Sequence, residues 1–344
     1  MNNRIVIEDV RQFVDHFELS EHLRNKSFLI TGATGLIGSI LIKCLVELNR
    51  QKKLGVKIVA LVRDAEKAQS IFDDEFDMID FRQIALDNIS SDSVGTGIDY
   101  IVHLASPTAS KFFVEHPVET LRTTIEGTTV VLEYAKTAKI EAMVLASSLE
   151  VYGTNEGDSL IGEDFQGYVN PLNVRSSYNI GKRAAESLCH AYAREYGAPV
   201  KIARLTQTTG AGISKDDNRV IAQFARLTAE GMDIILHTTG ESARPYCYTT
   251  DVVSALLYIL LKGENGEAYN VANEDTYISI RDMADYLKEN FNPKMNVRMK
   301  LNENMGYAPI TKLNLDTSKL EELGWKPLYD LEQIFTRLIL FMSN

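Results

Sequence analysis

The sequence predicts an α/β protein built on a doubly wound parallel sheet, with a smaller C-terminal lobe. Short apolar runs with strand character alternate with longer segments of helical periodicity over the first two thirds of the chain. A glycine-rich turn separates the first apolar run from the helical segment after it, and beyond about residue 210 the pattern becomes less regular. Such alternation places successive strands in parallel, with the connecting helices on both faces of the sheet.

Each element is justified by its own pattern. Apolar positions at helical spacing predict a short amphipathic helix within residues 1–25. Buried strands are expected at residues 27–31, 56–62, 99–106, 142–148 and 199–205, and helical periodicity marks residues 39–50, 117–136 and 176–196. The later part is expected to contain a strand at 233–238 and helices at 219–230, 251–261 and 280–291.

The chain is therefore expected to have three parts. Residues 1–25 form an N-terminal helical extension that packs on the lobe or on a partner subunit. Residues 26–210 form the main α/β domain. Residues 211–344 form mainly the smaller lobe, with some segments that return to the main domain.

Composition narrows the class of protein. With 344 residues, 45% of them hydrophobic, the chain can bury a substantial core. A net charge of −11 argues against a nucleic acid or an anionic membrane as partner. The three cysteines are far apart in apolar sequence, which favours reduced core thiols over a disulfide framework or a metal site. No apolar run approaches a membrane span and the start is polar, so a cytoplasmic protein is expected.

The turn TGATGLIG predicts a dinucleotide site. Gly32, Gly35 and Gly38 lie between a strand and a helix, where glycine allows a tight turn and the approach of the backbone to a pyrophosphate. The helix that follows offers N–H groups and a partial positive charge. This is the Rossmann arrangement, and the contact residues expected in the same turn are Thr34, Leu36 and Ile37.

The end of the second strand bears on the choice between NAD and NADP. Arg63 can pair with a 2′-phosphate and therefore favours NADP, whereas in the alternative Arg63 is solvated and Asp64 accepts a hydrogen bond from the ribose of NAD. Asp87 lies in IALDNIS, after a further strand expected between those at 56–62 and 99–106. There it is either an adenine contact or a cap of a helix or turn.

Tyr178 and Lys182 are the strongest catalytic candidates. They lie four residues apart on a predicted helix and so share one face. A neighbouring ammonium favours phenolate and lowers the pKa of a tyrosine, which suits proton exchange with a hydroxyl group. Ser148 ends a strand at the sheet edge where such folds bind ligands, and its hydroxyl can hold the substrate oxygen.

Three further residues are candidates for the substrate. Glu150 points to the same side as Ser148 if the segment is extended, and it is either a second acid/base or a structural hydrogen-bond acceptor. Arg219 and Arg244 are the cations expected on a nucleotide diphosphate, because an acidic protein must concentrate positive charge where it binds phosphate. Surface ion pairing is the alternative for both arginines.

From about Ser27 to Trp325 the chain resembles the extended short-chain dehydrogenase/reductase family that acts on nucleotide sugars. TGATGLIG is similar to its cofactor motif and YNIGK to its Tyr-Lys pair. Within the family, VHLASP, LASSLEVYG, GYVNPLNVRSSYNIGKRAAES and GESARPYCYTTD are most similar to UDP-glucuronate decarboxylases. Those enzymes use NAD to oxidise the sugar at C4, release carbon dioxide and then reduce the 4-keto pentose.

The resemblance implies a role for each matching residue. Tyr178 would be the base, and Lys182 would adjust the pKa of Tyr178 and contact the ribose. Ser148 would be the hydroxyl partner, and Glu150 would be the additional acid/base. It also implies an Arg244 contact near the diphosphate or the reacting sugar, cofactor contacts from Leu104, Ala105 and Ser106, a substrate contact from Gln207, and a homodimer formed through the helices at 117–136 and 176–196.

The sequence also departs from this pattern. Arg63 replaces an acidic residue, Gln207 and Thr124 replace asparagines, and Leu149 replaces the aspartate of dTDP-glucose 4,6-dehydratases. Alternatives are therefore an NADPH-dependent reductase of a nucleotide-linked keto sugar, for example one that makes a CDP-alditol, and a nucleotide-sugar 4-epimerase. A non-enzymatic alternative is a regulatory protein that senses a dinucleotide.

Overall fold

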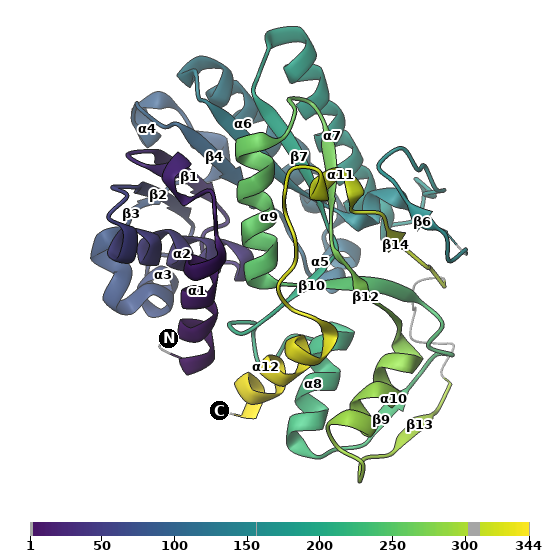
Figure 1. Cartoon of the computed structure of the whole chain (residues 1–344). Coiled ribbons are helices and arrows are strands. Elements are labelled where there is room, and N and C mark those ends of the chain that lie inside the picture. Colours follow the sequence, from purple (N-terminus) through teal and green to yellow (C-terminus); the bar gives the residue numbers. More distant parts are fainter. Residues whose placement is uncertain (1–2, 156, 302–309, 344) are drawn as a thin grey trace.

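The computed structural model of the chain describes residues 3–155, 157–301 and 310–343 (Figure 1). Residues 1 and 2 of the predicted N-terminal extension, and residues 302–309 and 344 of the predicted C-terminal lobe, lie outside the described residues.

A parallel sheet of seven strands forms the centre of the molecule. Its order is β11-β7-β5-β4-β1-β2-β3, and every neighbouring pair is parallel. The strands are β1 (Ser27–Thr31), β2 (Lys57–Val62), β3 (Asp80–Gln83), β4 (Tyr100–His103), β5 (Ala142–Ser148), β7 (Val200–Leu205) and β11 (Ala268–Val271). The strand order reverses between β1 and β4, and in sheets of this kind ligands bind beyond the carboxyl ends of the strands at such a point. The predicted doubly wound fold is confirmed.

Helices cover both faces of the sheet because strand side chains alternate between them. Phe28 and Ile30 on β1 join the core under α2 (Leu36–Lys52) and α9 (Thr249–Lys262). Leu29, between them, joins the core under α6 (Pro117–Ala138) and α7 (Ser176–Tyr196). The shorter helices of this part are α3 (Ala65–Phe72), α4 (Ser91–Val94) and α5 (Ser110–Glu115).

Most of the remaining elements form the smaller lobe in the lower part of Figure 1, whereas a strand pair at the right and a short helix that contacts β11 lie higher. A three-stranded sheet with the order β12-β10-β8 links this lobe to the main sheet. Its strands are β8 (Gln207–Thr209), β10 (Ala243–Tyr248) and β12 (Asn273–Ser279). The other elements are two strand pairs, β6 (Leu160–Ile161) with β14 (Asn314–Leu315) and β9 (Ile234–Leu236) with β13 (Val297–Met299), and the helices α8 (Val220–Glu230), α10 (Ile280–Asn290), α11 (Ser318–Glu321) and α12 (Leu331–Ser343).

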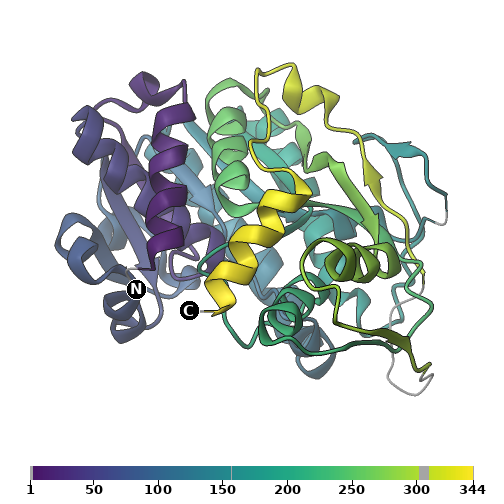
Figure 2. The same cartoon turned by 60° about the horizontal axis from the view of Figure 1, so that its bottom comes forward.

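The N-terminal extension packs on its own chain. Figure 2 shows α1 (Arg4–His16) beside α9 and α12. Its apolar face is buried in the main core, and the Asp9 carboxylate accepts hydrogen bonds from the Tyr248 hydroxyl at 2.6 Å and from Arg337 at 2.5 Å. This helix therefore packs on its own chain, and a contact with a partner subunit stays a prediction.

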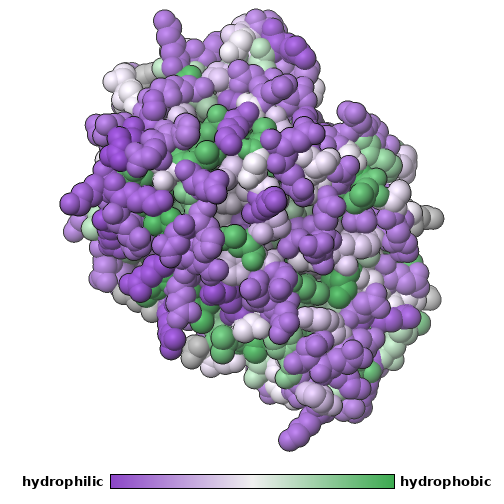
Figure 3. Space-filling model, in the orientation of Figure 1, coloured by the Kyte–Doolittle hydropathy of each residue, from purple (hydrophilic) through white to green (hydrophobic). Residues whose placement is uncertain are grey.

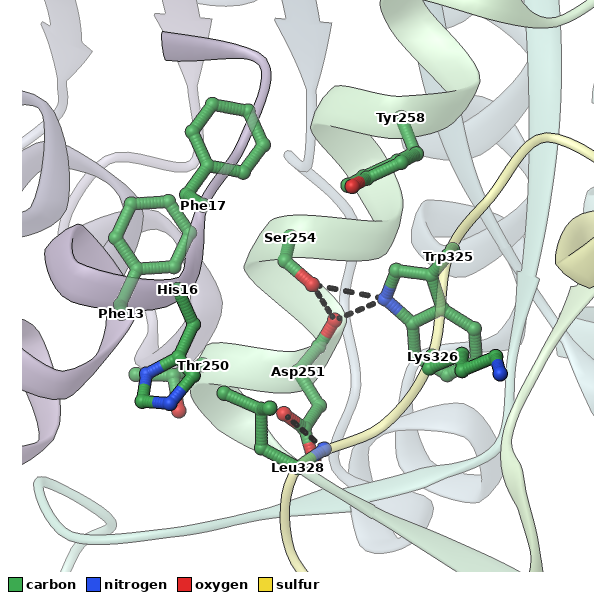
Figure 4. Close-up of a pocket in the computed structure, with 10 residues that line it drawn as sticks. All are labelled: Phe13, His16, Phe17, Thr250, Asp251, Ser254, Tyr258, Trp325, Lys326 and Leu328. Carbon is green, nitrogen blue, oxygen red and sulfur yellow. Dashed lines mark hydrogen bonds between the residues drawn. The ribbon is translucent and has the colours of Figure 1, made fainter.

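A small pocket of about 50 Å³ lies between α1, α9 and the segment 325–328 (Figure 4). Phe13 and Phe17 line one side, and Trp325 on the other side donates from Nε1 to Ser254 Oγ at 2.8 Å. The Asp251 carboxylate accepts from the backbone N–H groups of Leu328 and Tyr329, both at 3.1 Å. These bonds fix the C-terminal segment to the start of α9.

The surface is mainly polar. Figure 3 shows hydrophilic side chains over most of one face, with apolar patches scattered among them. Across the described residues, no helix is both long enough and apolar enough to span a membrane.

Candidate active site

The glycine turn brings the start of α2 close to β4. Gly32 has a φ of +70°, and a Cβ there would lie 2.8 Å from the carbonyl carbon of Leu104. A Cβ on Gly38 would lie 2.3 Å from the Gly32 oxygen. Gly35 is exposed and caps α2, so the free N–H groups of the first helical turn open beyond the sheet edge. This cradle fits a pyrophosphate.

The other predicted residues of the turn and of the β4 end lie around this cradle. Thr34, Leu36 and Ile37 are half-buried. The backbone N–H groups of Leu104 and Ala105 each donate to Thr31 Oγ1 at 3.1 Å.

Hydroxyl groups of Thr31, Ser106 and Thr124 lie between the end of β4 and α6. Thr31 Oγ1 also lies 2.7 Å from His103 Nδ1. Burial lowers the His103 pKa to about 3, so this ring is neutral. Ser106 Oγ lies 3.5 Å from Thr124 Oγ1, so the threonine that stands in place of an asparagine faces the predicted cofactor segment.

The end of β2 presents Arg63 to solvent. Within the described residues its guanidinium makes no hydrogen bond or ion pair, while its backbone oxygen accepts a hydrogen bond from Gln83 Nε2 at 3.1 Å. The Asp64 carboxylate caps α3 by accepting from the Lys67 N–H at 2.9 Å. Asp87 is exposed, and the short helix in which it lies, Leu86–Asn88, has no side-chain cap.

Ser148, Tyr178 and Lys182 come together at the carboxyl end of β5. Ser148 is the last residue of β5, and Tyr178 and Lys182 are buried on the facing side of α7. Lys182 Nζ donates to the Ala146 carbonyl at 2.7 Å and lies 5.8 Å from the centre of the Tyr178 ring. Phe113 from α5 stacks on this ring, with centroids 4.3 Å apart and an interplanar angle of 10°.

Burial dominates the electrostatics of the tyrosine and lysine. It raises the Tyr178 pKa well above its ordinary value; the Glu150 charge adds to this shift and a hydrogen bond with Ser148 opposes it. Burial also lowers the Lys182 pKa to about 8. The predicted lowering of the Tyr178 pKa is therefore wrong for this arrangement, because the phenol is desolvated and the ammonium is bonded to a carbonyl.

Glu150 lies near Tyr178, but an extended segment after Ser148 is not what places it there. The segment after Ser148 is not extended; it forms a 3-10 turn over Leu149–Tyr152. One side of α7 holds this turn: Asn179 Nδ2 donates to the Glu150 carbonyl at 2.7 Å, and Arg183 Nε donates to the Val151 carbonyl at 2.7 Å. Arg175 Nη2 donates to the Glu150 carboxylate at 3.3 Å.

A buried ion pair between Arg204 and Glu186 holds the elements of the site together. Arg204 on β7 donates to the Glu186 carboxylate, with a shortest contact of 2.7 Å. Ser147 also donates to Glu186, and Arg204 donates to the Tyr152 hydroxyl at 3.1 Å. These bonds connect α7 with β5, β7 and the 3-10 turn.

The predicted substrate residues of the smaller lobe differ in how their side chains are engaged. Gln207 is half-buried on β8 and pairs in register with Tyr246 on β10. Arg219 makes an ion pair with Asp217 at 2.9 Å, which is the alternative that the sequence left open. Arg244 is half-buried on β10, and its guanidinium has no hydrogen-bond or ion-pair partner among the described residues.

Sequence reasoning missed several residues of this region. Glu186 continues the spacing of four that begins with Tyr178 and Lys182, and Arg175, Asn179 and Arg183 repeat the same spacing on a neighbouring side of α7. Both series were visible in the sequence. Thr31 and His103 gave no such signal, because their pairing depends on the register of β1 and β4.

The family model described as NAD dependent epimerase/dehydratase family matches residues 28–272. The chain is similar to UDP-glucuronic acid decarboxylase 5 of Arabidopsis thaliana, with 31% identity over 312 residues that cover 90% of this chain and 87% of the relative. It is 29% identical to UDP-glucuronic acid decarboxylase 1 of Danio rerio over 326 residues, which cover 95% of this chain and 74% of the relative.

Solved structures share the fold. UDP-glucose 4-epimerase from Thermotoga maritima, crystallised with UDP-glucose, superposes with a TM-score of 0.77 at 23% identity, covering 92% of this chain and 98% of that one. UDP-glucuronic acid 4-epimerase from Bacillus cereus, in complex with NAD, gives a TM-score of 0.74 at 22% identity, with the same coverage of 92% and 98%.

Proposed function

Because the chain belongs to the NAD-dependent epimerase/dehydratase family, we propose that it is an enzyme that oxidises or reduces the sugar of a nucleotide diphosphate sugar. The most concrete form of this proposal is the conversion of UDP-glucuronate to UDP-xylose with loss of carbon dioxide. Relatives named UDP-glucuronic acid decarboxylases, similar over about nine tenths of the chain, support this form.

The observation that carries the proposal is the meeting of Ser148, Tyr178 and Lys182 at the sheet edge that also holds the glycine cradle. When bound, the nicotinamide dinucleotide supplies hydride transfer to and from a sugar carbon. Gly32, Gly35, Gly38 and the first turn of α2 would hold its pyrophosphate.

The side chains of the chain supply the proton chemistry. Ser148 orients the sugar hydroxyl, and Tyr178 exchanges a proton with it. Lys182 stabilises the phenolate when its ammonium turns from the Ala146 carbonyl to the tyrosine oxygen. Glu150 supplies a carboxylate near the sugar. As a base it takes up a proton from water, and the carboxylic acid so formed can give that proton to the carbon left by the departing carbon dioxide.

Arg63 favours a second candidate function, a reductase of a nucleotide-linked keto sugar that uses NADPH. Its guanidinium is exposed at the end of β2, the position that meets the 2′-phosphate of NADP. The raised Tyr178 pKa also fits reduction, because it keeps the phenol protonated and so available as the proton source for the oxygen atom that develops from a ketone.

One assay separates the two functions. The purified protein is incubated with UDP-glucuronate and NAD, and separately with keto-sugar nucleotides and NADPH, while nicotinamide absorbance and product mass are followed. A product lighter by carbon dioxide without a net absorbance change supports the decarboxylase. Steady consumption of NADPH supports the reductase, and no conversion in either assay would contradict both.

The proposal includes a cytoplasmic homodimer. Helices α6 and α7 lie side by side on one face of the sheet (Figure 1), where they can pair with the same helices of a second copy. Cys44, Cys189 and Cys247 are buried free thiols, as suits a reducing compartment. A monomer in light scattering at micromolar concentration would contradict the dimer.

A further inference from the structure

We propose that Arg175 determines substrate specificity at this site by binding the carboxylate of an anionic sugar in exchange for Glu150. The proposal rests on the proposed function and narrows its substrate class to nucleotide-linked uronates.

The place of Arg175 suits this role. It immediately precedes α7, with helical backbone angles, and lies three residues before Tyr178, so that the two side chains project from nearby sides of the helix. Its Nη2 reaches the Glu150 carboxylate at 3.3 Å, and the Glu150 charge in turn acts on the Tyr178 phenol. The Arg175 and Glu150 side chains are 33% and 23% exposed, so a ligand can reach the pair.

Arg175 also retains unused donors. A guanidinium has five N–H groups, and one Arg175 side-chain bond is seen among the described residues, the bond to Glu150. The other cations of this side are engaged with the protein: Lys182 with the Ala146 carbonyl, Arg183 with two backbone carbonyls and Arg204 with Glu186. An incoming carboxylate therefore finds free N–H groups at Arg175.

The charges at the site explain why the substrate carboxylate must replace Glu150 as the partner of Arg175. The chain carries a net charge of −11, and Glu150 by itself would repel an anionic sugar. The single contact between Arg175 and Glu150 is long for a charge-assisted hydrogen bond, whereas a carboxylate that approaches the guanidinium edge can make two short parallel bonds. A neutral sugar makes no such bonds and leaves the ion pair as it is.

The test measures binding without turnover. All variants are made in a Tyr178→Phe background and saturated with NAD, and calorimetry gives the Kd of UDP-glucuronate and of UDP-glucose. Arg175→Gln is expected to weaken UDP-glucuronate at least about tenfold and UDP-glucose less than about threefold, as expected for loss of a charge-assisted contact. Arg4→Gln is the matched control, since Arg4 is an exposed arginine paired with Glu8 on the distant α1.

A second pair of variants separates direct contact from an effect through Glu150. If Arg175 binds the substrate carboxylate, Arg175→Gln still weakens UDP-glucuronate selectively when Glu150 is already changed to Gln. If it only screens Glu150, the selective loss disappears in that background and the proposal is overturned. Equal weakening of both ligands, or no weakening, also overturns it.

A failure of the proposed function would give a different binding result from a failure of the Arg175 role alone. In that case the parent protein binds NAD but neither UDP-sugar, and the role of Arg175 falls together with the function.

Discussion

Glu186 follows Lys182 by four residues on α7, and its carboxylate is held by Arg204 from β7 at 2.7 Å. Lys182 faces Tyr178, Glu186 and Cys189 on its own helix and His103 on β4. Of these groups Glu186 is the carboxylate, and its charge raises the Lys182 pKa against the larger effect of burial. The buried pair therefore favours the charged form of Lys182 and also joins α7 to the sheet.

Replacing Glu186 by Gln should change both stability and pH dependence. Because Arg204 is left as a buried unpaired charge, the free energy of unfolding should fall by about 3–5 kcal/mol. Because the Lys182 pKa falls further, the alkaline limb of the kcat/KM profile should move to lower pH. Urea denaturation and the pH profile measure the two effects, with the exposed Glu195→Gln on the same helix as control. If the alkaline limb of the kcat/KM profile does not move, Glu186 has a structural role only and does not affect the Lys182 pKa.

Tyr178→Phe tests the proton chemistry directly. The substitution removes the hydroxyl group but keeps the ring that stacks on Phe113. Turnover should fall at least about 100-fold, the lower range for a general acid or base, while NAD or NADP still binds. Stopped assays and cofactor titration measure the two quantities. Tyr196→Phe, an exposed tyrosine at the end of α7, should be unaffected; full activity of the Tyr178 variant would refute the mechanism.

The central sheet could be predicted because its signals are local. Each strand is a short apolar run, the connecting helices have a period of 3.6 residues, and Gly32 and Gly38 mark a turn that few other residues can form. The Tyr178–Lys182 pair could be predicted for the same reason, since spacing along a helix decides which side chains lie together.

What the sequence could not supply depends on contacts between distant segments. Glu150 was expected to point to the side of Ser148 if its segment were extended, but α7 holds that segment in a 3-10 turn through Asn179 and Arg183. The Tyr178 pKa was expected to fall, but its shift depends on burial by α5, which spacing does not reveal. Side-chain partners across 18 or more residues, such as Arg204 and Glu186, follow only from the packed fold.

Arg63→Ala tests the choice of cofactor. A charge-assisted bond to a 2′-phosphate contributes about 1.5–3 kcal/mol, so NADP should bind more weakly by this amount while NAD is hardly affected. Fluorescence titration with each dinucleotide measures the two affinities. Arg82→Ala is the matched control, because Arg82 lies on neighbouring β3 and is paired with Asp80 at 2.6 Å. Equal losses for both cofactors would refute a 2′-phosphate contact.

Asp251 should give the protein a characteristic pH dependence of stability. Its carboxylate is buried at the start of α9 (Figure 4), and burial raises its pKa from 3.8 to about 7. Between these two values the folded state holds a proton on Asp251 that the unfolded state releases. The contribution of this group is therefore fully present below pH 3.8, and it is lost as the pH rises towards 7, by up to about 1.4 kcal/mol per pH unit.

Asp251→Asn removes this titration but keeps one oxygen acceptor for the backbone N–H groups of Leu328 and Tyr329. Urea denaturation between pH 4.5 and 7.5 should show a variant whose stability declines less with rising pH than that of the parent. The part of the decline that remains is expected from Asp9, whose pKa burial raises to about 6. Asp15→Asn, on the exposed side of α1, should retain the parental slope. If Asp251→Asn lowers stability by the same amount at every pH, the loss comes from hydrogen bonding alone and Asp251 does not titrate in this range.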